Sequence, residues 1–536
     1  MLNHCLAVLS MLSIPCTTSA RMHPFSVHDM LAMDRISDPQ ISPAGDKIVF
    51  VLRKTDLENN KGTTDLWLVN SDGTGLKQLT THEASDANPR WHPQGKTLYF
   101  ISTRSGSAQV WQIPIDGGEA NQVTDLPLDV SNLIVSPDGT SIAFTMEVFV
   151  GKTPKETSDK LKEIEKQKTT GRIYDRLFIR HWDAWKDGRR SHLFVMPIDG
   201  TGEPVDVMKD MDADTPAKPF GGPEEITFTP NSRGLVFTAR DAGEKEAWST
   251  NFDIYLSVIT ASRPPRNITA TNLAWDTNPI FTPAGNALAS LAMARPGYES
   301  DRFRIVMRFS EENPDDKQIL TQHWDRSPGS IVFSPDSKTI YTTARNLGQK
   351  SLFAIDAETG KVTTLVKDGS ISVFAATADR VYFAMNNFKN PTELYSVKSD
   401  GADIKQLTNI NADKIASVKM GDYEQFTFKG WNEETVYCYV VKPIDFDPSK
   451  TYPVAFLIHG GPQGSFGNMF HYRWNPQAYA GAGYAAVMVD FHGSTGYGQA
   501  FCDSIRGDWG GKPFVDLQKG LTAALDRYPW MDRKRQ

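Results

Sequence analysis

The stretch Tyr452-Pro-Val-Ala-Phe-Leu-Ile-His459-Gly460-Gly461-Pro462 decides how the last part of this chain folds. It contains a continuous apolar run that is closed by a glycine pair. Such a run is typical of a strand that is buried on both faces and that delivers a loop to the edge of a sheet. Because glycines follow His459 directly, bare backbone N–H groups can point at a developing oxyanion.

Neighbouring segments predict the rest of a mixed α/β sheet. A second apolar strand is expected at Tyr484–Asp490, and the glycine-rich loop Phe491–Gly498 follows it. Two earlier segments, Glu424–Phe428 and Thr435–Lys442, are typical of a hairpin that opens the sheet. The segment Pro513–Asp526 has the periodicity of an amphipathic helix.

Two of these segments resemble a known family. HGGP (residues 459–462) and FHGSTGYGQAF…WGGKPFVDL (from Phe491) are similar to the hydrolase domain of the prolyl oligopeptidase family. The dipeptidyl-peptidase V and acylaminoacyl-peptidase branch is the most similar part of that family. The resemblance implies an α/β-hydrolase domain over residues 421–536. It also implies an oxyanion loop made of His459, Gly460, Gly461 and Pro462, with the backbone N–H of Gly461 as one donor.

The catalytic serine of such a family is absent from this sequence. Acyl transfer needs a serine in a G-x-S-x-G turn, then an aspartate and a histidine later in the chain. No G-x-S-x-G occurs in the 536 residues, so no catalytic residue can be assigned. In the family, the strand after the helix that ends near Tyr528 leads directly to the serine. The resemblance therefore implies a triad beyond Gln536, and we expect a truncated hydrolase domain that is inactive as given.

The first part of the chain is built from a repeat. The turn-and-strand unit Ser42-Pro-Ala-Gly-Asp-Lys-Ile-Val-Phe50 recurs at His92–Phe100 and at Ser136–Phe144. Degenerate copies begin at Thr229, Thr282, Ser334 and Ala378. A second half-unit, first seen at Asp65-Leu-Trp67, recurs at intervals of 42 to 61 residues apart from one gap of 83. Four-stranded propeller blades have such a period, which a large β-sandwich would lack. The sequence predicts an all-β seven-bladed propeller over residues 21–420, followed by the incomplete α/β-hydrolase domain.

The gap of 83 residues contains an insertion, predicted at residues 147–190. Thr153-Pro-Lys-Glu156 has the N-cap, proline and acidic residue of a helix start. The segment after this helix is dense in Arg, Trp and Asp, and it resembles the blade insertion of the same family branch. A peptide's ammonium group needs a carboxylate, and its side chains need aromatic walls. The candidates for binding a substrate N-terminus are Glu147, Asp175, Asp183, Trp182 and Trp185. The alternative is a cluster of ion pairs and tryptophans that only joins two blades.

Composition and targeting signals limit the partners and the location. A net charge of −7 without a basic stripe argues against nucleic acid. No apolar run reaches the roughly 20 residues that a membrane span needs.

The N-terminus has the features of a targeting signal. Leu6–Ile14 is a short apolar core and Thr18-Ser-Ala20 a cleavage site, so residues 1–20 are predicted to be a secretory signal. The protein would then be extracellular, or periplasmic in a bacterium. The alternative is a disordered cytosolic extension. Asn267 begins an N-glycosylation sequon.

The sequence favours a hydrolase that needs no cofactor. Neither Cys438 nor Cys502, the cysteines left after the predicted signal, has zinc-ligand spacing, and their pairing stays open. We expect a serine-type exopeptidase that releases N-terminal dipeptides from short peptides. The alternatives are an acylaminoacyl-peptidase and a non-catalytic propeller that binds or scaffolds a partner. A carboxylesterase-like hydrolase shares the His-Gly-Gly loop but does not explain the blades.

Overall fold

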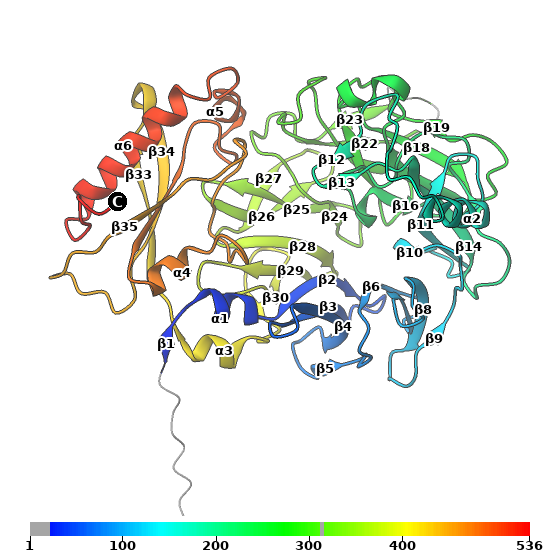
Figure 1. Cartoon of the computed structure of the whole chain (residues 1–536), viewed down its shortest axis with the longest axis horizontal. Helices are drawn as coiled ribbons and strands as arrows, with labels where there is room; N and C mark the ends of the chain where they lie inside the picture. The colour runs from blue at the N-terminus through cyan, green and yellow to red at the C-terminus, as the bar shows by residue number, and fades with distance from the viewer. Residues whose placement is uncertain (1–21, 311–312, 314–315) are drawn as a thin grey trace, which may run out of the picture.

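The computed structural model describes residues 22–310, 313 and 316–536. The predicted signal and its cleavage site lie outside the described residues. The chain forms two parts that lie side by side (Figure 1). A large ring of β-sheets comes from the N-terminal part of the chain, and a smaller α/β sheet comes from the C-terminal part.

Within the described residues the ring has seven blades, as the repeat predicts. Five blades are separate four-stranded sheets, and the last two are joined into one sheet by a single parallel pair, Lys350 with Ser370. The strands are, blade by blade, β2 Arg35–Ile41, β3 Lys47–Asp56, β4 Lys61–Asn70, β5 Lys77–Gln78; β6 Asp86–Trp91, β7 Thr97–Ser102, β8 Gln109–Pro114, β9 Asn121–Gln122; β10 Ser131–Val135, β11 Ser141–Phe149, β14 Arg189–Pro197, β15 Val205–Asp206; β16 Ile226–Phe228, β17 Gly234–Ala239, β18 Asp253–Val258, β19 Arg266–Asn267; β20 Asp276–Phe281, β21 Leu288–Ala292, β22 Arg304–Arg308, β23 Lys317–Ile319; β24 Val332–Phe333, β25 Thr339–Asn346, β26 Gln349–Asp356, β27 Val362–Val366; and β28 Ser370–Ala376, β29 Arg380–Asn386, β30 Glu393–Lys398, β31 Lys405–Gln406.

The repeated Ser-Pro-x-Gly unit is the turn between the first and second strands of a blade. In blade 1, Gly45 has φ +74° and its N–H donates to the Ser42 carbonyl oxygen at 2.8 Å. Glycine adopts this left-handed conformation without steric cost. The strand that follows is apolar on both faces, because each blade packs between two others. The ring closes where blade 1 packs on blade 7, in a buried cluster that includes Phe50 and Tyr382.

The insertion is shorter than the sequence predicts. Glu147, Val148 and Phe149 still belong to β11, where they pair with Ser191 to Arg189 of β14. The predicted start at Glu147 is therefore wrong, because the buried strand continues through Phe149 and the chain turns only at Gly151 (φ +75°). Helix α2 (Pro154–Glu165) has the predicted capping box of Thr153 and Glu156. A small hairpin follows, made of β12 (Arg180–His181) and β13 (Ala184–Trp185).

The second part is a mixed sheet in the order β33-β34-β36-β35, with a helix on each face. Cys438 of β34 belongs to the same buried cluster as Ala524 of α6, whereas the next residue, Tyr439, clusters with Ala480 of α4. Because the central strands are covered on both faces, they are apolar without alternation. The elements are β33 Tyr423–Lys429, β34 Thr435–Val441, β35 Val454–Leu457, α4 Pro476–Gly481, β36 Ala485–Asp490, α5 Gln499–Asp503 and α6 Lys512–Arg527.

Strand β35 lies at the edge of this sheet, and later residues run beside its beginning. The N–H of Tyr452 donates to the Trp530 carbonyl oxygen at 2.8 Å, and the N–H of Val454 donates to that of Arg535 at 2.8 Å. The Trp530 ring packs edge-on against Phe446 at 4.8 Å between centroids. These contacts cover the start of the edge, whereas the later part of β35 leads directly into the glycine loop.

The first described residues connect the two parts. Strand β1 (His23–Pro24) pairs in parallel with β32 (Val418–Lys419), which follows the short helix α3 (Ala412–Ala416). Helix α1 (Val27–Ala32) begins at a capping box made by Ser26 and Asp29. Just before it, the buried Phe25 packs edge-on against Phe470 of the second part, at 6.0 Å. Residues next to the predicted cleavage site thus help to fix the α/β part on the ring.

The tip of the β25–β26 hairpin inserts into the α/β part. The N–H of Leu347 donates to the Gly496 carbonyl oxygen at 3.0 Å. The Gly348 carbonyl oxygen accepts from the Tyr439 hydroxyl at 3.0 Å and from the N–H of Asn468 at 2.8 Å. Blade 6 is therefore the main docking element of the ring.

Candidate active site

The loop after β35 presents an unused backbone donor at the carboxyl end of the strand. The strand ends at Leu457, two residues before His459, which the sequence placed inside it. Gly461 has φ +136°, and a Cβ there would lie 2.8 Å from the backbone nitrogen of Gln463. In the described part of the chain, the Gly461 N–H meets no acceptor. The peptide bond to Pro462 is cis.

The loop is clamped onto the loop that follows β36. The His459 ring stacks on Phe491 with 4.3 Å between centroids and 12° between planes. Its Nε2 lies 2.9 Å from the Ser494 Oγ. The N–H of Thr495 donates to the Gly464 carbonyl oxygen at 2.8 Å. The two glycine-rich segments found in the sequence therefore form one unit, in which the second fixes the position of the first.

Asp490, the last residue of β36, organises this unit, and the sequence analysis did not single it out. Its side chain is buried, and its Oδ2 accepts from the Ser465 hydroxyl at 2.5 Å and the Tyr497 hydroxyl at 2.6 Å. Its Oδ1 accepts from the N–H of Phe466 at 3.0 Å. Burial and the charge of Asp490 hold the pKa of Tyr497 well above its ordinary value, so this hydroxyl stays a donor. An acidic residue that ends a buried strand before a glycine loop was the signal that could have identified it.

Ser494, His459 and Asp490 resemble a catalytic triad but lack its geometry. In a triad the histidine uses one ring nitrogen for the serine and the other for the aspartate. Here both neighbours lie on the Nε2 side, at 2.9 Å for Ser494 Oγ and 3.7 Å for Asp490 Oδ1, while Nδ1 lies 2.8 Å from the Gly460 carbonyl oxygen. Ser494 is also fully buried. This set therefore supports the loop and does not supply a nucleophile.

A cavity of about 710 Å³ opens beside the loop. The oxyanion loop forms one wall, and aromatic and apolar side chains, among them Phe388, Met469 and Tyr479, form the others. Ile458 and Trp474 line it as well and are more than half exposed. An apolar cavity next to bare N–H groups suits the side chain of a peptide whose carbonyl group is attacked at the loop.

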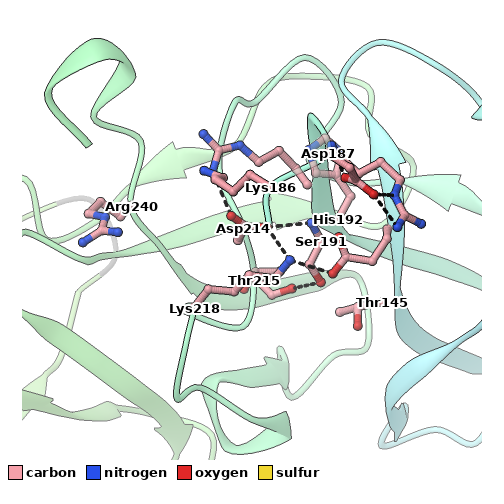
Figure 2. Close-up of polar contacts among 12 residues, drawn as sticks. Thr145, Lys186, Asp187, Ser191, His192, Asp214, Thr215, Lys218 and Arg240 are labelled. Carbon is pink, nitrogen blue, oxygen red and sulfur yellow. Dashed lines mark hydrogen bonds and ion pairs between the residues drawn. The ribbon is translucent and has the colours of Figure 1, made fainter. Parts of the chain in front are cut away.

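The insertion lies against a buried ion-pair network that is centred on Arg190. This side chain contacts Asp212 at 2.8 Å, Asp214 at 2.8 Å and Glu246 at 2.7 Å. Burial acts to lower the pKa of Arg190, but its bonds to Glu246 and Asp214 outweigh burial and raise it. Asp214 accepts from the N–H of Ser191 at 2.8 Å, and its Oδ1 lies 3.1 Å from Lys218 Nζ. Figure 2 shows these residues side by side. Such a network joins blades 3 and 4.

The five candidates for binding a substrate N-terminus differ in whether they already have a partner in the structure. Glu147 is engaged, because its Oε1 lies 2.6 Å from Lys218 Nζ. Asp175 and Asp183 are exposed, and neither carboxylate has a hydrogen bond or ion pair within the described residues. Trp182, at the tip of the β12–β13 hairpin, packs edge-on against Phe220 with 5.3 Å between centroids. Trp185 lies 6.2 Å from the Tyr174 ring.

The remaining sequence features are placed as follows. Asn267 is half-buried in the outermost strand of blade 4, and its Oδ1 accepts from the N–H of the buried Thr269 at 2.9 Å. Cys438 and Cys502 are buried free thiols. Among the described residues, no group of three or more His, Cys, Asp or Glu side chains could hold a metal ion. No helix in the same residues is long and apolar enough to cross a membrane.

Comparisons with known proteins agree with both parts of the structure. Residues 31–162 match the TolB beta propeller domain, and residues 470–536 match the prolyl oligopeptidase family. Dipeptidyl-peptidase 5 of Porphyromonas gingivalis is 30% identical over 515 residues, which cover 94% of this chain and 73% of that protein. Dipeptidyl-peptidase 5 of Schizosaccharomyces pombe is 28% identical over 533 residues, or 97% of this chain and 75% of that protein.

A solved structure shows the same fold. The acylaminoacyl peptidase of Pyrococcus horikoshii superposes with a TM-score of 0.74 over 95% of this chain and 73% of that protein, at 20% identity. Its fold, a propeller joined to an α/β-hydrolase domain, matches the two parts described above. Together with the dipeptidyl-peptidase 5 relatives, this shows that the chain belongs to the prolyl oligopeptidase family of serine hydrolases.

Proposed function

We propose that this chain is the propeller and oxyanion-loop part of a serine-type exopeptidase that releases N-terminal dipeptides from short peptides. The observation that carries the proposal is the unused N–H of Gly461, held by the clamped loop at the wall of an apolar cavity. Preorganised donors of this kind stabilise the oxyanion of acyl transfer. Two relatives that cover most of the chain are named dipeptidyl-peptidase 5.

The reaction also needs a nucleophile and a base, which residues 1–536 do not contain in a G-x-S-x-G context. Loss of these groups typically slows such a reaction by about 10⁴–10⁶-fold. We therefore propose that the 536 residues alone bind peptides without hydrolysing them, and that the triad is supplied by sequence beyond Gln536.

Exposed carboxylates on the insertion favour release of dipeptides over release of acylated residues. A free N-terminal ammonium needs a charged acceptor, and an acylated N-terminus does not. Because Glu147 is already paired with Lys218, the free carboxylates of Asp175 and Asp183 are the better acceptors. The exposed rings of Trp182 and Trp185 would contact the first side chains of the peptide.

The test is product analysis by mass spectrometry with one peptide in two forms. Ala-Phe-Ala-Ala and its N-acetylated form are incubated with the product of the complete reading frame and with residues 21–536 alone. We expect Ala-Phe from the free peptide, at least tenfold less cleavage of the acetylated peptide, and no cleavage by residues 21–536. Preferred cleavage of the acetylated peptide would overturn the assignment and favour an acylaminoacyl-peptidase.

A second candidate function rests on the missing serine motif. If the complete reading frame adds no G-x-S-x-G, the chain is a binding protein built on a peptidase fold, and no peptide is cleaved. The same incubation then returns both peptides unchanged.

We propose further that the protein is secreted after removal of residues 1–20, and that Asn267 is glycosylated in a eukaryotic host. The apolar core Leu6–Ile14 and the small residues at Thr18–Ala20 support the first proposal. N-terminal sequencing of protein recovered from the medium should start near Arg21. A sequence that starts at Met1, in protein found only in the cytosol, would contradict it.

A further inference from the structure

A second cavity, of about 390 Å³, lies between blades 5 and 6 and the α/β part. The α/β wall carries Gln463, the residue directly after the oxyanion loop, and Gly496 of the loop that clamps it. The wall from blade 6 carries three cationic side chains, Arg326, Arg345 and Lys350. The cavity therefore connects the docking surface of the ring to the candidate active site.

Two of these cations oppose each other directly. Arg345 of β25 and Lys350 of β26 are cross-strand partners, so their side chains share one face of the ladder. Like charges in this arrangement destabilise a sheet. Neither side chain forms an ion pair within the described residues. Arg345 Nη1 donates to the Ser465 carbonyl oxygen at 3.1 Å, and Lys350 Nζ lies 3.4 Å from Ser372 Oγ. Burial and the charge of Arg345 lower the pKa of Lys350.

Arg326 completes the cationic wall from the segment before β24. Its Nε donates to the Asn346 side-chain oxygen at 2.9 Å, and its Nη1 donates to the Asp325 carbonyl oxygen at 2.6 Å. It forms no ion pair in the part of the chain that the structure describes. Both guanidinium groups are thus fixed by neutral oxygens beside the half-buried ammonium group of Lys350.

The acidic residues of the cavity do not neutralise the pair Arg345 and Lys350. Asp301 is held by Arg295, whose Nε lies 3.1 Å from its Oδ1, and by the N–H of Ala294. Asp325 accepts from the N–H of Gln499 at 2.9 Å, on the opposite wall, and its charge acts on the neighbouring Arg326. Glu299 is exposed to solvent. The remaining cation, Arg302, donates to the carbonyl oxygens of its own blade and is not available.

We propose that the pair Arg345 and Lys350, assisted by Arg326, binds a carboxylate of the peptide substrate. Carboxylates form strong charge-assisted hydrogen bonds with such groups and would relieve the repulsion within the pair. Arg345 also donates to the carbonyl oxygen of Ser465, in the segment that follows the oxyanion loop, so the cationic pair is connected to the candidate active site. The pocket then selects short peptides by their charged end. This inference rests on the proposed function, because it names a subsite of the same peptidase.

The carboxylate has two sources, the peptide C-terminus or an acidic side chain, and binding measurements on residues 21–536 distinguish them. The probes for calorimetry at low salt are Ala-Ala-Ala, its C-terminal amide, Ala-Ala-Glu-amide and N-acetyl-Ala-Ala-Ala. We expect Ala-Ala-Ala or Ala-Ala-Glu-amide to bind at least about tenfold more tightly than Ala-Ala-Ala-amide, and the difference to shrink as salt screens it. Tighter binding of Ala-Ala-Ala identifies the peptide C-terminus as the source of the carboxylate, and tighter binding of Ala-Ala-Glu-amide identifies an acidic side chain.

Variants test which residues are responsible. The double variant Arg345→Gln/Lys350→Gln should bind acid and amide equally, whereas Arg345→Lys should keep most of the difference. Lys338→Gln removes one positive charge at an exposed turn of blade 6 and should change nothing. Thermal melting of each variant confirms that it is folded.

The proposal would be overturned if wild type bound both Ala-Ala-Ala and Ala-Ala-Glu-amide no more tightly than Ala-Ala-Ala-amide. A difference that persists in the double variant, or the absence of any binding, would overturn it as well. Failure of the proposed function gives another result: N-acetyl-Ala-Ala-Ala would bind as tightly as Ala-Ala-Ala, while the preference for a carboxylate stands.

Discussion

Gly461 is the residue on which the geometry of the oxyanion loop depends. At φ +136° a side chain is strained, and a Cβ would also lie 2.8 Å from the Gln463 nitrogen. We predict that Gly461→Ala lowers the free energy of unfolding by about 1–3 kcal/mol, measured by urea titration of residues 21–536. Gly460→Ala is the matched control, because a Cβ there meets no atom within 4 Å and should cost less than about 0.5 kcal/mol. Equal losses for the two variants would contradict this role.

At the same scale, the sequence predicts the loop that carries the backbone N–H donor better than it predicts the side chains that hold this loop in place. The His-Gly-Gly loop could be predicted because a glycine pair directly after an apolar strand has few other structural roles. Asp490 was not predicted, because its role arises from contacts with Ser465, Phe466 and Tyr497, which only the fold brings together. Glu147 was predicted as a free acceptor, but Lys218, distant in sequence, already neutralises it.

At the scale of elements, His492 connects strand β36 to helix α6 and to the β33–β34 hairpin. The ring is buried, with Nδ1 2.5 Å from Asp516 Oδ2 and Nε2 3.1 Å from Glu434 Oε2. Burial acts to lower the pKa of His492, but the bonds to Asp516 and Glu434 outweigh it and raise the pKa. The imidazolium thus stabilises the attachment of α6 to the sheet.

This raised pKa gives a pH dependence with a defined sign. The contribution of His492 to stability is fully present below about pH 6.5, the ordinary value, and is lost as the pH rises through the folded-state pKa. We predict that the difference in free energy of unfolding between wild type and His492→Gln shrinks from about pH 6 to about pH 9, by ~1.4 kcal/mol for each unit of pKa shift. Burial raises the pKa of Glu225 and Asp276 to about 7. These groups titrate in wild type and in His492→Gln alike, so their contributions cancel in the difference between the two free energies of unfolding. The exposed His323→Gln is the control, and a difference that stays constant with pH would refute the assignment.

The β25–β26 hairpin gives the second prediction at this scale. Gly348 has φ +78°, and a Cβ there would lie 2.5 Å from Gln425 Nε2 and 2.9 Å from the Tyr439 ring. Gly106 has φ +94° but open space around it. Gly106→Ala therefore has the cost of a side chain at positive φ without a steric clash of the added Cβ. We predict that Gly348→Ala costs ~1–3 kcal/mol more than Gly106→Ala in urea unfolding, because it separates the two parts. Limited proteolysis should also cut Gly348→Ala faster between residues 407 and 423; equal rates would argue against a docking role.

Elements with their own local signals were predicted well. Helices α2 and α6 start where capping residues or proline indicate, and the Ser-Pro-x-Gly turns mark the second strand of the blades. Boundaries without such a signal were missed. The insertion begins later than expected because β11 continues through Phe149, and β35 ends before His459 because the glycine loop starts early.

For the whole molecule, periodicity alone predicts the seven-bladed ring, because each blade repeats the same turn and hairpin. The way the ring meets the α/β part could not be predicted from it. That interface depends on single contacts between distant segments, such as Leu347 with Gly496 and Phe25 with Phe470. The cationic cavity lies in this interface, which explains why no motif in the sequence indicates it.

The central claim is that these residues form the oxyanion half of a serine peptidase whose nucleophile lies outside them. Labelling with a fluorophosphonate, followed by mapping of the labelled peptide, tests this most directly. With the product of the complete reading frame, we predict one labelled serine beyond residue 536. We also predict no label on residues 21–536 expressed alone. In Gly461→Ala we predict labelling at least about tenfold slower, because alanine keeps the N–H but its Cβ, 2.8 Å from the Gln463 nitrogen, forces the loop and this donor out of position. A labelled serine within residues 21–536, or an equal rate in Gly461→Ala, would contradict the account.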